Sequence, residues 1–205
     1  VAGSCDETVR SFQLSGDAPP AIERRHELRG HSLSINSVAV SADASLAASS
    51  GLDSHIRLWN LEHGEELLDI NAGPIEAWSV SLAGNGRFLA SGTHRGHVNL
   101  WSVKEALRGA GAASDPPMDT IPTGASAFVF SVAFSPDGKQ VACGTAEGAV
   151  YVLDVETKKM LHRLDGHSSN VRTLAFSADG ARLTTGSDDG HVNMYEVSTA
   201  LQVAS

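Results

Sequence analysis

Five stretches of this chain follow the same pattern of residue types, and their regular spacing constrains the fold more strongly than any other feature of the sequence. Each stretch has small residues, a polar turn, a β-rich run and a bulky last residue. The copies are AGSCDETVRSFQ (2–13), SSGLDSHIRLWN (49–60), SGTHRGHVNLWS (91–102), CGTAEGAVYVLD (143–154) and TGSDDGHVNMYE (185–196). Their last core residues are Phe12, Trp59, Trp101, Leu153 and Tyr195. A period of roughly 40–45 residues is typical of a repeated unit of four short strands.

The residues between these stretches predict the remaining strands of each unit. Alternating apolar residues predict inner strands at INSVAV (35–40), AWSVSL (77–82), VFSVAF (129–134) and VRTLAF (171–176). Turns rich in Asp, Asn, Pro and Gly follow at 41–44, 83–86, 135–138 and 177–180. Outer strands are predicted at EELLDI (65–70), MDTIP (118–122) and MLHRL (160–164). The pattern resembles that of WD-repeat β-propellers, an all-β fold in which four-stranded blades surround a channel.

The repeats divide the chain into four complete blades and part of another. We assign the blades to residues 1–29 (partial), 30–70, 71–122, 123–164 and 165–205. Closed propellers leave no exposed sheet edge, so we expect a partial propeller, about four and a half blades of about seven. Such a piece would be a fragment of a longer propeller or the product of an incomplete gene model. We expect it to associate or aggregate when expressed alone, since both end blades are uncovered.

One connection is longer than the others. VKEALRGAGAASDPPM (103–118) lies between two predicted strands of the third blade. Its first part is compatible with one or two helical turns, and its Gly, Ala and Pro residues favour a flexible loop. A surface insertion is the simpler interpretation, and a partner-binding loop is the alternative.

Two blades carry the polar network of full WD repeats, in which a His, a Ser or Thr, an Asp and a Trp form a buried relay. The predicted members are His31, Ser49, Asp53 and Trp59 in the second blade, and His167, Thr185, Asp189 and Tyr195 in the fifth. The third blade has Arg95 in the Asp position and the fourth has Glu147, so we expect these two blades to rely on apolar packing. Because the set recurs with the repeat, a structural role is favoured over a hydrolytic triad.

Composition argues against several classes of function. The formal net charge of −9 disfavours direct nucleic-acid binding. The one basic cluster, Arg24, Arg25 and His26 with Arg29, is flanked by Glu23 and Glu27 and is interpreted as a solvated outer strand. No apolar run reaches the roughly 18 residues needed to cross a membrane. Cys5 and Cys143 are too few for a disulfide framework or zinc site, which favours a reducing compartment. The nine His residues are scattered, with one close pair at His94 and His97, so surface positions are favoured over metal ligation and no metal or cofactor is expected.

A more specific resemblance covers nearly the whole chain. Residues 47–103 and 144–176 resemble the family of WD-repeat subunits shared by the superkiller complex and, in animals, the polymerase-associated-factor complex. The discriminating motifs are AGPIEAW (72–78) and SGTHRGHVN (91–99), which replace the usual Gly–His and Ser–Asp signatures. The resemblance is weakest in the insertion.

The resemblance implies a noncatalytic scaffold found in both nucleus and cytoplasm. In the superkiller complex, its implied partners are a helicase and a tetratricopeptide-repeat scaffold that serve exosome-mediated mRNA decay. In the other complex, they are the polymerase-associated-factor subunits, which support transcription elongation and histone modification.

Propellers bind partners at the mouth of the channel, on the face that we call the top face. Repeat alignment predicts that its exposed positions are Asn36, Leu52, Trp78, His94, Phe130, Arg172 and Asp188. Aromatic residues and Arg are enriched at binding hot spots, so Trp78 and Phe130 are candidate anchors. The alternative is that both pack within their strands.

Two other functions remain open at this level. The first is a substrate receptor of a ubiquitin ligase, or a signalling scaffold like the heterotrimeric G-protein β subunit, although the sequence has no adaptor-binding segment or basic phosphate pocket. The second is an enzyme, but no carboxylate pair, metal-ligand spacing or phosphate-binding loop is present beyond the repeat. Fold alone does not decide between them.

Overall fold

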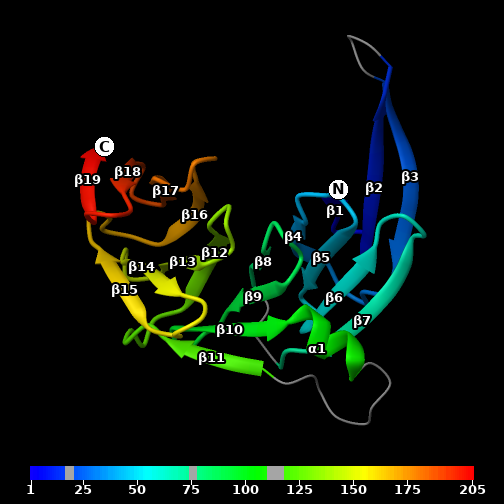
Figure 1. The fold of residues 1–205 in the computed structure, drawn as a ribbon, viewed down its shortest axis with the longest axis horizontal. Helices are drawn as coiled ribbons and strands as arrows, with labels where there is room; N and C mark the ends of the chain where they lie inside the picture. The colour runs from blue at the N-terminus through cyan, green and yellow to red at the C-terminus, as the bar shows by residue number, and fades with distance from the viewer. Residues whose placement is uncertain (17–20, 74–77, 110–117) are drawn as a thin grey trace.

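The protein folds into five antiparallel sheets that follow one another along an open arc. In a computed structural model, residues 1–16, 21–73, 78–109 and 118–205 are described. Figure 1 shows the sheets in chain order, with the first and the last at opposite ends of the arc. The architecture is that of a partial β-propeller, which confirms the predicted all-β fold class.

Each sheet is built from strands that are consecutive in the sequence. The first contains β1 (Ala2–Gly3), β2 (Thr8–Ser15) and β3 (Ala21–Arg29). The second contains β4 (Ile35–Val40), β5 (Leu46–Gly51), β6 (His55–Asn60) and β7 (Glu65–Asn71). The third contains β8 (Val80–Leu82), β9 (Phe88–Gly92), β10 (His97–Ser102) and β11 (Met118–Pro122). The fourth contains β12 (Val129–Phe134), β13 (Gln140–Thr145), β14 (Val150–Asp154) and β15 (Met160–Leu164). The fifth contains β16 (Val171–Phe176), β17 (Arg182–Ser187), β18 (Val192–Glu196) and β19 (Leu201–Ala204).

The inner strand of the third blade is shorter than the sequence pattern predicts. We expected a strand over 77–82, but β8 begins only at Val80. Trp78 lies before the strand, where its ring packs against two phenylalanines of the next blade. Ala77, like the rest of 74–77 within the motif AGPIEAW, is outside the described residues.

The long connection of the third blade begins with the only helix in the described part of the chain. This helix, α1 (Val103–Arg108), buries Val103 and Ala106 against the core between the second and third blades. Residues 110–117 of the predicted insertion 103–118 are outside the described residues. Within the described ranges, no helix is long and apolar enough to span a membrane.

The core consists of four apolar clusters that lie between neighbouring blades. Each cluster combines residues of one blade with the bulky last core residue of the next, namely Trp59, Trp101, Leu153 or Tyr195. Phe12 was predicted to be the equivalent core residue of the first blade, but it is 42% exposed. The prediction is wrong because, among the described residues, no further blade packs against that side of the first sheet.

The first turn of the second blade contains a residue in an unfavourable conformation. Equivalent turns end in Gly86, Gly138 and Gly180, with φ between 68° and 72°, whereas Ala44 has φ 55° in the second blade. A Cβ atom in this left-handed region costs roughly 1–2 kcal/mol, partly offset by the greater chain entropy that glycine loses on folding. Ala44→Gly is therefore expected to raise the free energy of unfolding by about 0.5–1 kcal/mol in urea denaturation. Gly138→Ala should have the opposite effect, and a loss of stability in Ala44→Gly would contradict this explanation.

Candidate functional site

In the second blade, four side chains form a continuous chain of hydrogen bonds from the protein surface to the core. His31 Nδ1 lies 2.9 Å from both carboxylate oxygens of Asp53, and His31 Nε2 lies 2.8 Å from Ser49 Oγ. The Trp59 indole Nε1–H donates to the same Ser49 oxygen over 2.8 Å. The consistent assignment is a neutral imidazole that donates from Nδ1 to Asp53 and accepts the Ser49 hydroxyl proton at Nε2.

Asp53 also joins the loops at the top of this blade. Its carboxylate accepts the backbone N–H of Ser32 at 2.9 Å and that of His55 at 3.2 Å. The loop before β4 and the turn between β5 and β6 are therefore tied to one side chain. The relay orients backbone and aromatic groups, and because Ser49 is fully buried, no water or substrate reaches its hydroxyl. This arrangement is suited to fixing strands rather than to hydrolysis.

Arg57 is a charged member of this network that the repeat pattern did not identify. Its guanidinium, which is almost buried, pairs with Asp53 at 3.1 Å, Glu66 at 2.9 Å and Asp69 at 2.8 Å. Arg57 lies two residues before Trp59 on β6, so both side chains point to the same side of the strand. This alternation along β6 could have identified Arg57 from the sequence, but its acidic partners on β7 come close to it only in the folded sheet.

The pKa values of His31 and Asp53 are both lower in this network than in water. Burial lowers the pKa of His31, and the nearby Arg57 acts in the same direction, while the bond to Asp53 opposes them. Burial acts to raise the pKa of Asp53, but hydrogen bonds from Ser32 and His31 outweigh it and lower this pKa to about 2. The network is therefore assembled at neutral pH with a neutral imidazole and an ionised carboxylate.

These shifts predict stepwise loss of stability in acid. Because the folded pKa of His31 lies below its unfolded value, its contribution is present above about pH 6.5 and is lost as pH falls below it. The contribution of Asp53 is lost only as pH falls from about 3.8 toward 2. Urea denaturation should show that the free energy of unfolding of the wild type decreases between about pH 7 and about pH 5. The decrease should be smaller in His31→Gln, which lacks the imidazole. An equal decrease in both proteins would contradict a depressed His31 pKa.

The fifth blade has a similar network with a different end. His167 Nδ1 lies 3.0 Å from Asp189, and His167 Nε2 lies 2.8 Å from Thr185 Oγ1. Asp189 also accepts the backbone N–H groups of Ser168 and His191, both at 2.9 Å. The Tyr195 hydroxyl donates to the Asp165 carbonyl at 3.4 Å. The phenol thus ties the fifth blade to the segment that follows the outer strand β15 of the preceding blade.

The third and fourth blades replace this network with other contacts. Arg95 occupies the Asp position of the third blade and donates from Nε to His94 Nε2 over 3.2 Å. In the fourth blade, Cys143 occupies the Ser position, and complete burial raises the pKa of its thiol to about 12. Glu147 is exposed at the Asp position. These blades are held chiefly by the apolar clusters around Trp101 and Leu153.

Three aromatic rings from two neighbouring blades form a cluster near the start of the inner strands β8 and β12. Trp78 meets Phe128 and Phe130 edge-on, with ring centroids 5.9 and 6.1 Å apart, and the two phenylalanine rings lie 4.6 Å apart. The Arg172 guanidinium lies over the Phe130 ring, 4.2 Å from its centroid. Trp78 remains 39% exposed, so its packing within the cluster leaves a free apolar surface.

Acidic and amide side chains hold Arg172 in place. Arg172 donates from Nε and Nη2 to one oxygen of Asp188, each over 2.8 Å, and Asn170 donates to the same oxygen over 2.8 Å. The hydrogen bond from Asn170 and then those from Arg172 lower the pKa of Asp188. We call Trp78, Phe128, Phe130, Arg172 and Asp188 the aromatic patch. It combines fixed rings with an ordered cation, which are the residue types that dominate protein-binding hot spots.

The structure places the predicted top-face residues unevenly. Trp78, Phe130, Arg172 and Asp188 are joined by direct contacts in the aromatic patch. Asn36 and Leu52 are exposed on the second blade, and His94 is half-buried beside Arg95. Phe128 was missed by repeat alignment because it precedes the strand. Its position two residues before Phe130 could have identified it, since alternate residues of an extended chain lie on the same side.

Backbone hydrogen bonds within and between blades hold this patch in place without a polar relay. Within the fourth blade, the Phe128 carbonyl accepts the Ala146 N–H at 2.9 Å, and between the fourth and third blades, Val129 N–H donates to the Thr93 carbonyl at 3.0 Å. Gly92 allows the close approach, because a Cβ atom there would lie 2.4 Å from Val129. Trp78 and Phe128 therefore lie on segments just before β8 and β12, while Phe130 lies on β12 itself.

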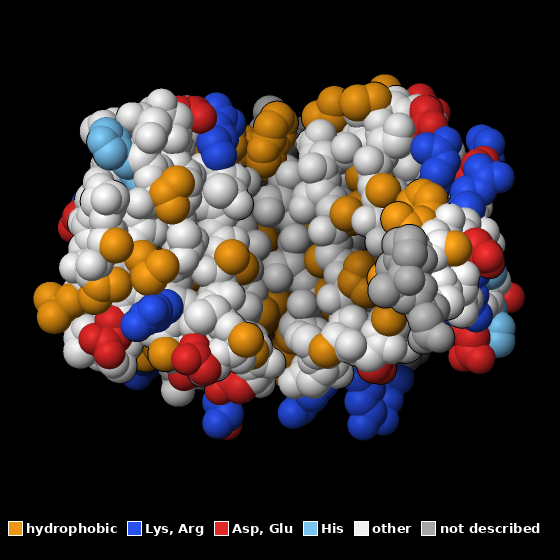
Figure 2. Space-filling view, turned by 90° about the horizontal axis from the view of Figure 1, so that it is seen from above, with side chains coloured by type: hydrophobic (Ala, Val, Ile, Leu, Met, Phe, Trp, Pro, Cys, Tyr) orange, Lys and Arg blue, Asp and Glu red, His pale blue; other side chains and the backbone are white. Residues whose placement is uncertain are grey.

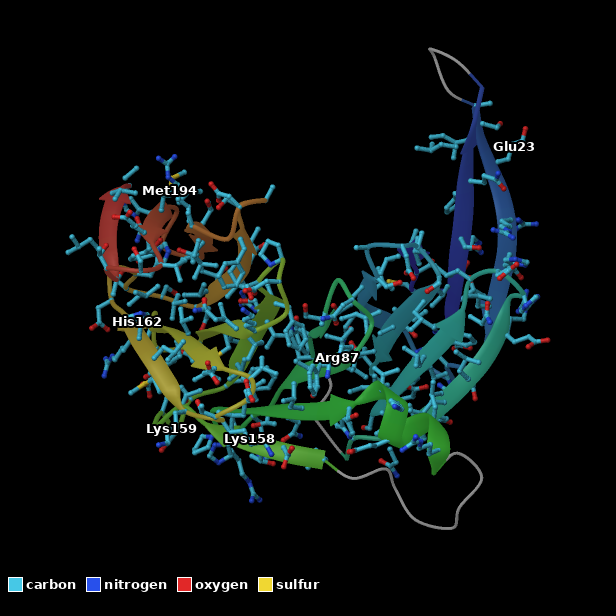
Figure 3. The ribbon with its side chains drawn as sticks, in the orientation of Figure 1. Glu23, Arg87, Lys158, Lys159, His162 and Met194 are labelled. Atoms are coloured by element: carbon cyan, nitrogen blue, oxygen red, sulfur yellow. The ribbon has the colours of Figure 1, made fainter. Side chains whose placement is uncertain are left out.

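Shallow grooves also lie between the third and fourth blades. One groove of about 390 Å³ is lined by residues of both signs, including Arg87, Lys139, Asp137 and Glu156. Figure 3 labels Arg87 and, on the connection before β15, Lys158, which pairs with Asp119 at 2.6 Å. Among the described residues, no three His, Cys, Asp or Glu side chains are grouped so as to hold a metal ion.

Comparison with known families agrees with the repeat structure. The family described as "WD domain, G-beta repeat" matches residues 22–60, 71–102 and 158–196. The family described as "Anaphase-promoting complex subunit 4 WD40 domain" matches residues 120–171. The matched segments together cover blades on both sides of the long connection.

Three curated proteins illustrate the similarity. The chain is 36% identical to "WD repeat-containing protein VIP3" of Arabidopsis thaliana over 177 residues, which cover 84% of this chain and 53% of the relative. It is 35% identical to "WD repeat-containing protein SL1-17" of Schistosoma mansoni over 172 residues, with coverage of 84% and 52%. It is 26% identical to "Meiotic recombination protein rec14" of Schizosaccharomyces pombe over 173 residues, with coverage of 83% and 53%. The chain thus spans about half the length of these relatives.

Proposed function

The chain belongs to the WD40 repeat family, and from this premise we propose that it is a scaffold subunit of the superkiller complex, the polymerase-associated-factor complex, or both. WD40 repeat domains generally mediate protein–protein contacts and are noncatalytic. The proposed partners are a helicase and a tetratricopeptide-repeat scaffold in the first complex, and the polymerase-associated-factor subunits in the second. The protein would act in the cytoplasm as part of the superkiller complex and in the nucleus as part of the polymerase-associated-factor complex.

The aromatic patch is the observation that supports a protein-binding role most strongly. An exposed Trp beside a stacked Arg offers a large apolar surface with one oriented cation. Because the rings already pack on one another, a partner would meet a preorganised surface and little side-chain entropy would be lost on binding. The motifs AGPIEAW and SGTHRGHVN support the choice of complex, and the first of them includes Trp78 of the patch.

Affinity capture followed by mass spectrometry tests this proposal. The tagged protein is expressed in its own cells and its partners are compared between nuclear and cytoplasmic extracts. Recovery of a helicase with a tetratricopeptide-repeat protein, or of polymerase-associated-factor subunits, is the expected result. Recovery of cullin adaptors or of G-protein signalling components, without either set, would assign the chain to another class of WD40 scaffold and contradict the proposal.

A further inference from the structure

In the second to fifth blades, the innermost strand is an edge strand of its sheet. These strands are β4, β8, β12 and β16, and Figure 1 shows them side by side around the hollow of the arc. Figure 2 looks into this hollow from the open side of the arc and shows mainly uncharged side chains and backbone on its wall. Within its sheet, an edge strand pairs only alternate N–H and C=O groups, so the others need partners from outside the sheet.

Two serine hydroxyls of the third blade supply such partners to the fourth. The Ser79 hydroxyl oxygen accepts the N–H of Val132 at 3.3 Å, and the Ser81 hydroxyl oxygen accepts that of Phe134 at 3.1 Å. Val132 and Phe134 are at most 9% exposed, so little water reaches these N–H groups and the serines satisfy donors that would be costly to leave unpaired. We call these two hydrogen bonds the serine bridge.

The first serine of the bridge occupies a recurring position of the repeat, and the second does not. Ser37 has the position of Ser79 in the second blade, and its hydroxyl accepts the Val80 N–H at 3.2 Å. Ser131 has the same position in the fourth blade. The position of Ser81 is occupied in the other complete blades by Ala39, Ala133 and Ala175. The junction between the third and fourth blades therefore has one hydroxyl more than the repeat position supplies.

The serine bridge lies directly beside the aromatic patch. Trp78 immediately precedes Ser79, and Phe130 precedes Val132 by two residues on β12. The edge-on contacts of Trp78 with Phe128 and Phe130 therefore cross the same junction that the bridge joins. Neither blade at this junction has the His–Asp relay that orders the second and fifth blades, so the placement of β12 beside the third blade depends more strongly on the bridge.

We propose that Ser79 and Ser81 are positioning residues of the aromatic patch, which hold β12 against the third blade so that Trp78 meets the phenylalanine rings edge-on. A binding surface keeps its geometry when supporting hydrogen bonds and packing hold its side chains within about 0.5 Å. The two serines act through the backbone of β12 and need not touch a partner. The effect on partner binding rests on the proposed function, whereas the effect on the geometry of the rings does not.

Ser79→Ala combined with Ser81→Ala removes the bridge, and its first effect is expected at the backbone. In hydrogen exchange resolved to single amides, the N–H groups of Val132 and Phe134 should exchange about tenfold faster in this double variant, because each loses its acceptor. Ser37→Ala removes the equivalent hydroxyl of the second blade and is the matched control, in which both amides should exchange as in the wild type. Wild-type exchange of both amides in the double variant would overturn the proposal.

Acrylamide quenching of tryptophan fluorescence measures the geometry of the patch without a partner. Trp59 and Trp101 are at most 2% exposed and Trp78 is 39% exposed, so quenching reports mainly on Trp78. Quenching should increase in the alanine double variant, because the Trp78 ring loses its edge-on contacts, and should stay at the wild-type level in the control. Ser79→Thr combined with Ser81→Thr keeps both hydroxyls and should also match the wild type. Unchanged quenching in the alanine variant, or an equal increase in the alanine and threonine variants, would overturn the proposal.

Affinity then separates this inference from the proposed function. The probe is the tetratricopeptide-repeat protein recovered by affinity capture, and its binding is measured by isothermal titration calorimetry. The alanine double variant should bind it about fivefold more weakly than the wild type and the control do, because the surface is less preorganised. Increased quenching with unchanged affinity would uphold the positioning role and contradict the role of the patch in binding. Weakened affinity with unchanged quenching would overturn the positioning role.

Discussion

Replacing Asp53 with alanine is expected to lower the free energy of unfolding by about 3 kcal/mol. The change removes the carboxylate that accepts His31 Nδ1–H and two backbone N–H groups, and it leaves the buried His31 donor without this acceptor. It also removes one of the three carboxylates around Arg57. Loss of one partner from a buried pair costs about 3–5 kcal/mol, and the lower end applies because Glu66 and Asp69 still neutralise the arginine.

Glu147→Ala is the matched control for this experiment. Glu147 occupies the same repeat position in the fourth blade, but it is exposed, so its removal should change stability by less than about 0.5 kcal/mol. Asp189→Ala should also destabilise the protein, because Asp189 accepts the equivalent bonds from His167, Ser168 and His191. All three variants are compared by urea denaturation. Equal shifts for Asp53→Ala and Glu147→Ala would refute the role given to the polar network.

The sequence predicted the strands well because the repeat supplies the same local signals several times. Inner strands such as β4 and β12 have the predicted bounds, since alternating apolar residues and a turn with Asp or Gly coincide there. The third blade is the exception. Its inner strand begins late, at Val80, because the Trp78 ring packs against rings of the next blade rather than within its own sheet.

Fixed spacings in the sequence predicted the members of the two polar networks, but not the further residues that bond to them. His31, Ser49 and Asp53 stand at constant distances before Trp59, and the structure joins all four by hydrogen bonds. Arg57 depends on acidic residues of a different strand. The exposure of Phe12 depends on which blades are neighbours. These properties arise from packing between segments, which a repeat pattern in one segment does not encode.

Loss of the aromatic patch should have the largest effect on function. Trp78→Ala combined with Phe130→Ala removes the exposed anchor and the ring beneath Arg172. Binding to a partner recovered by affinity capture is expected to weaken by more than about 2 kcal/mol, or about 30-fold in Kd. Isothermal titration calorimetry with that purified partner measures the change.

Two controls separate recognition from folding in this experiment. Met160→Ala removes an apolar side chain that is 50% exposed, against 39% for Trp78, from an outer strand and should bind like the wild type. Thermal unfolding of the double variant should remain cooperative, because its main contacts are with other patch residues rather than with the clusters between blades. Unchanged affinity in a folded double variant would remove this face from consideration as a binding site.

Recruitment in the cell tests most directly whether this protein acts as a scaffold through its top face. Wild type, the Trp78→Ala and Phe130→Ala double variant, and Met160→Ala are captured in parallel from differently isotope-labelled cells. We predict that the wild type and Met160→Ala recover the same partners in equal amounts, while the double variant is expressed and folded but loses them. Equal recovery by all three proteins would contradict the account.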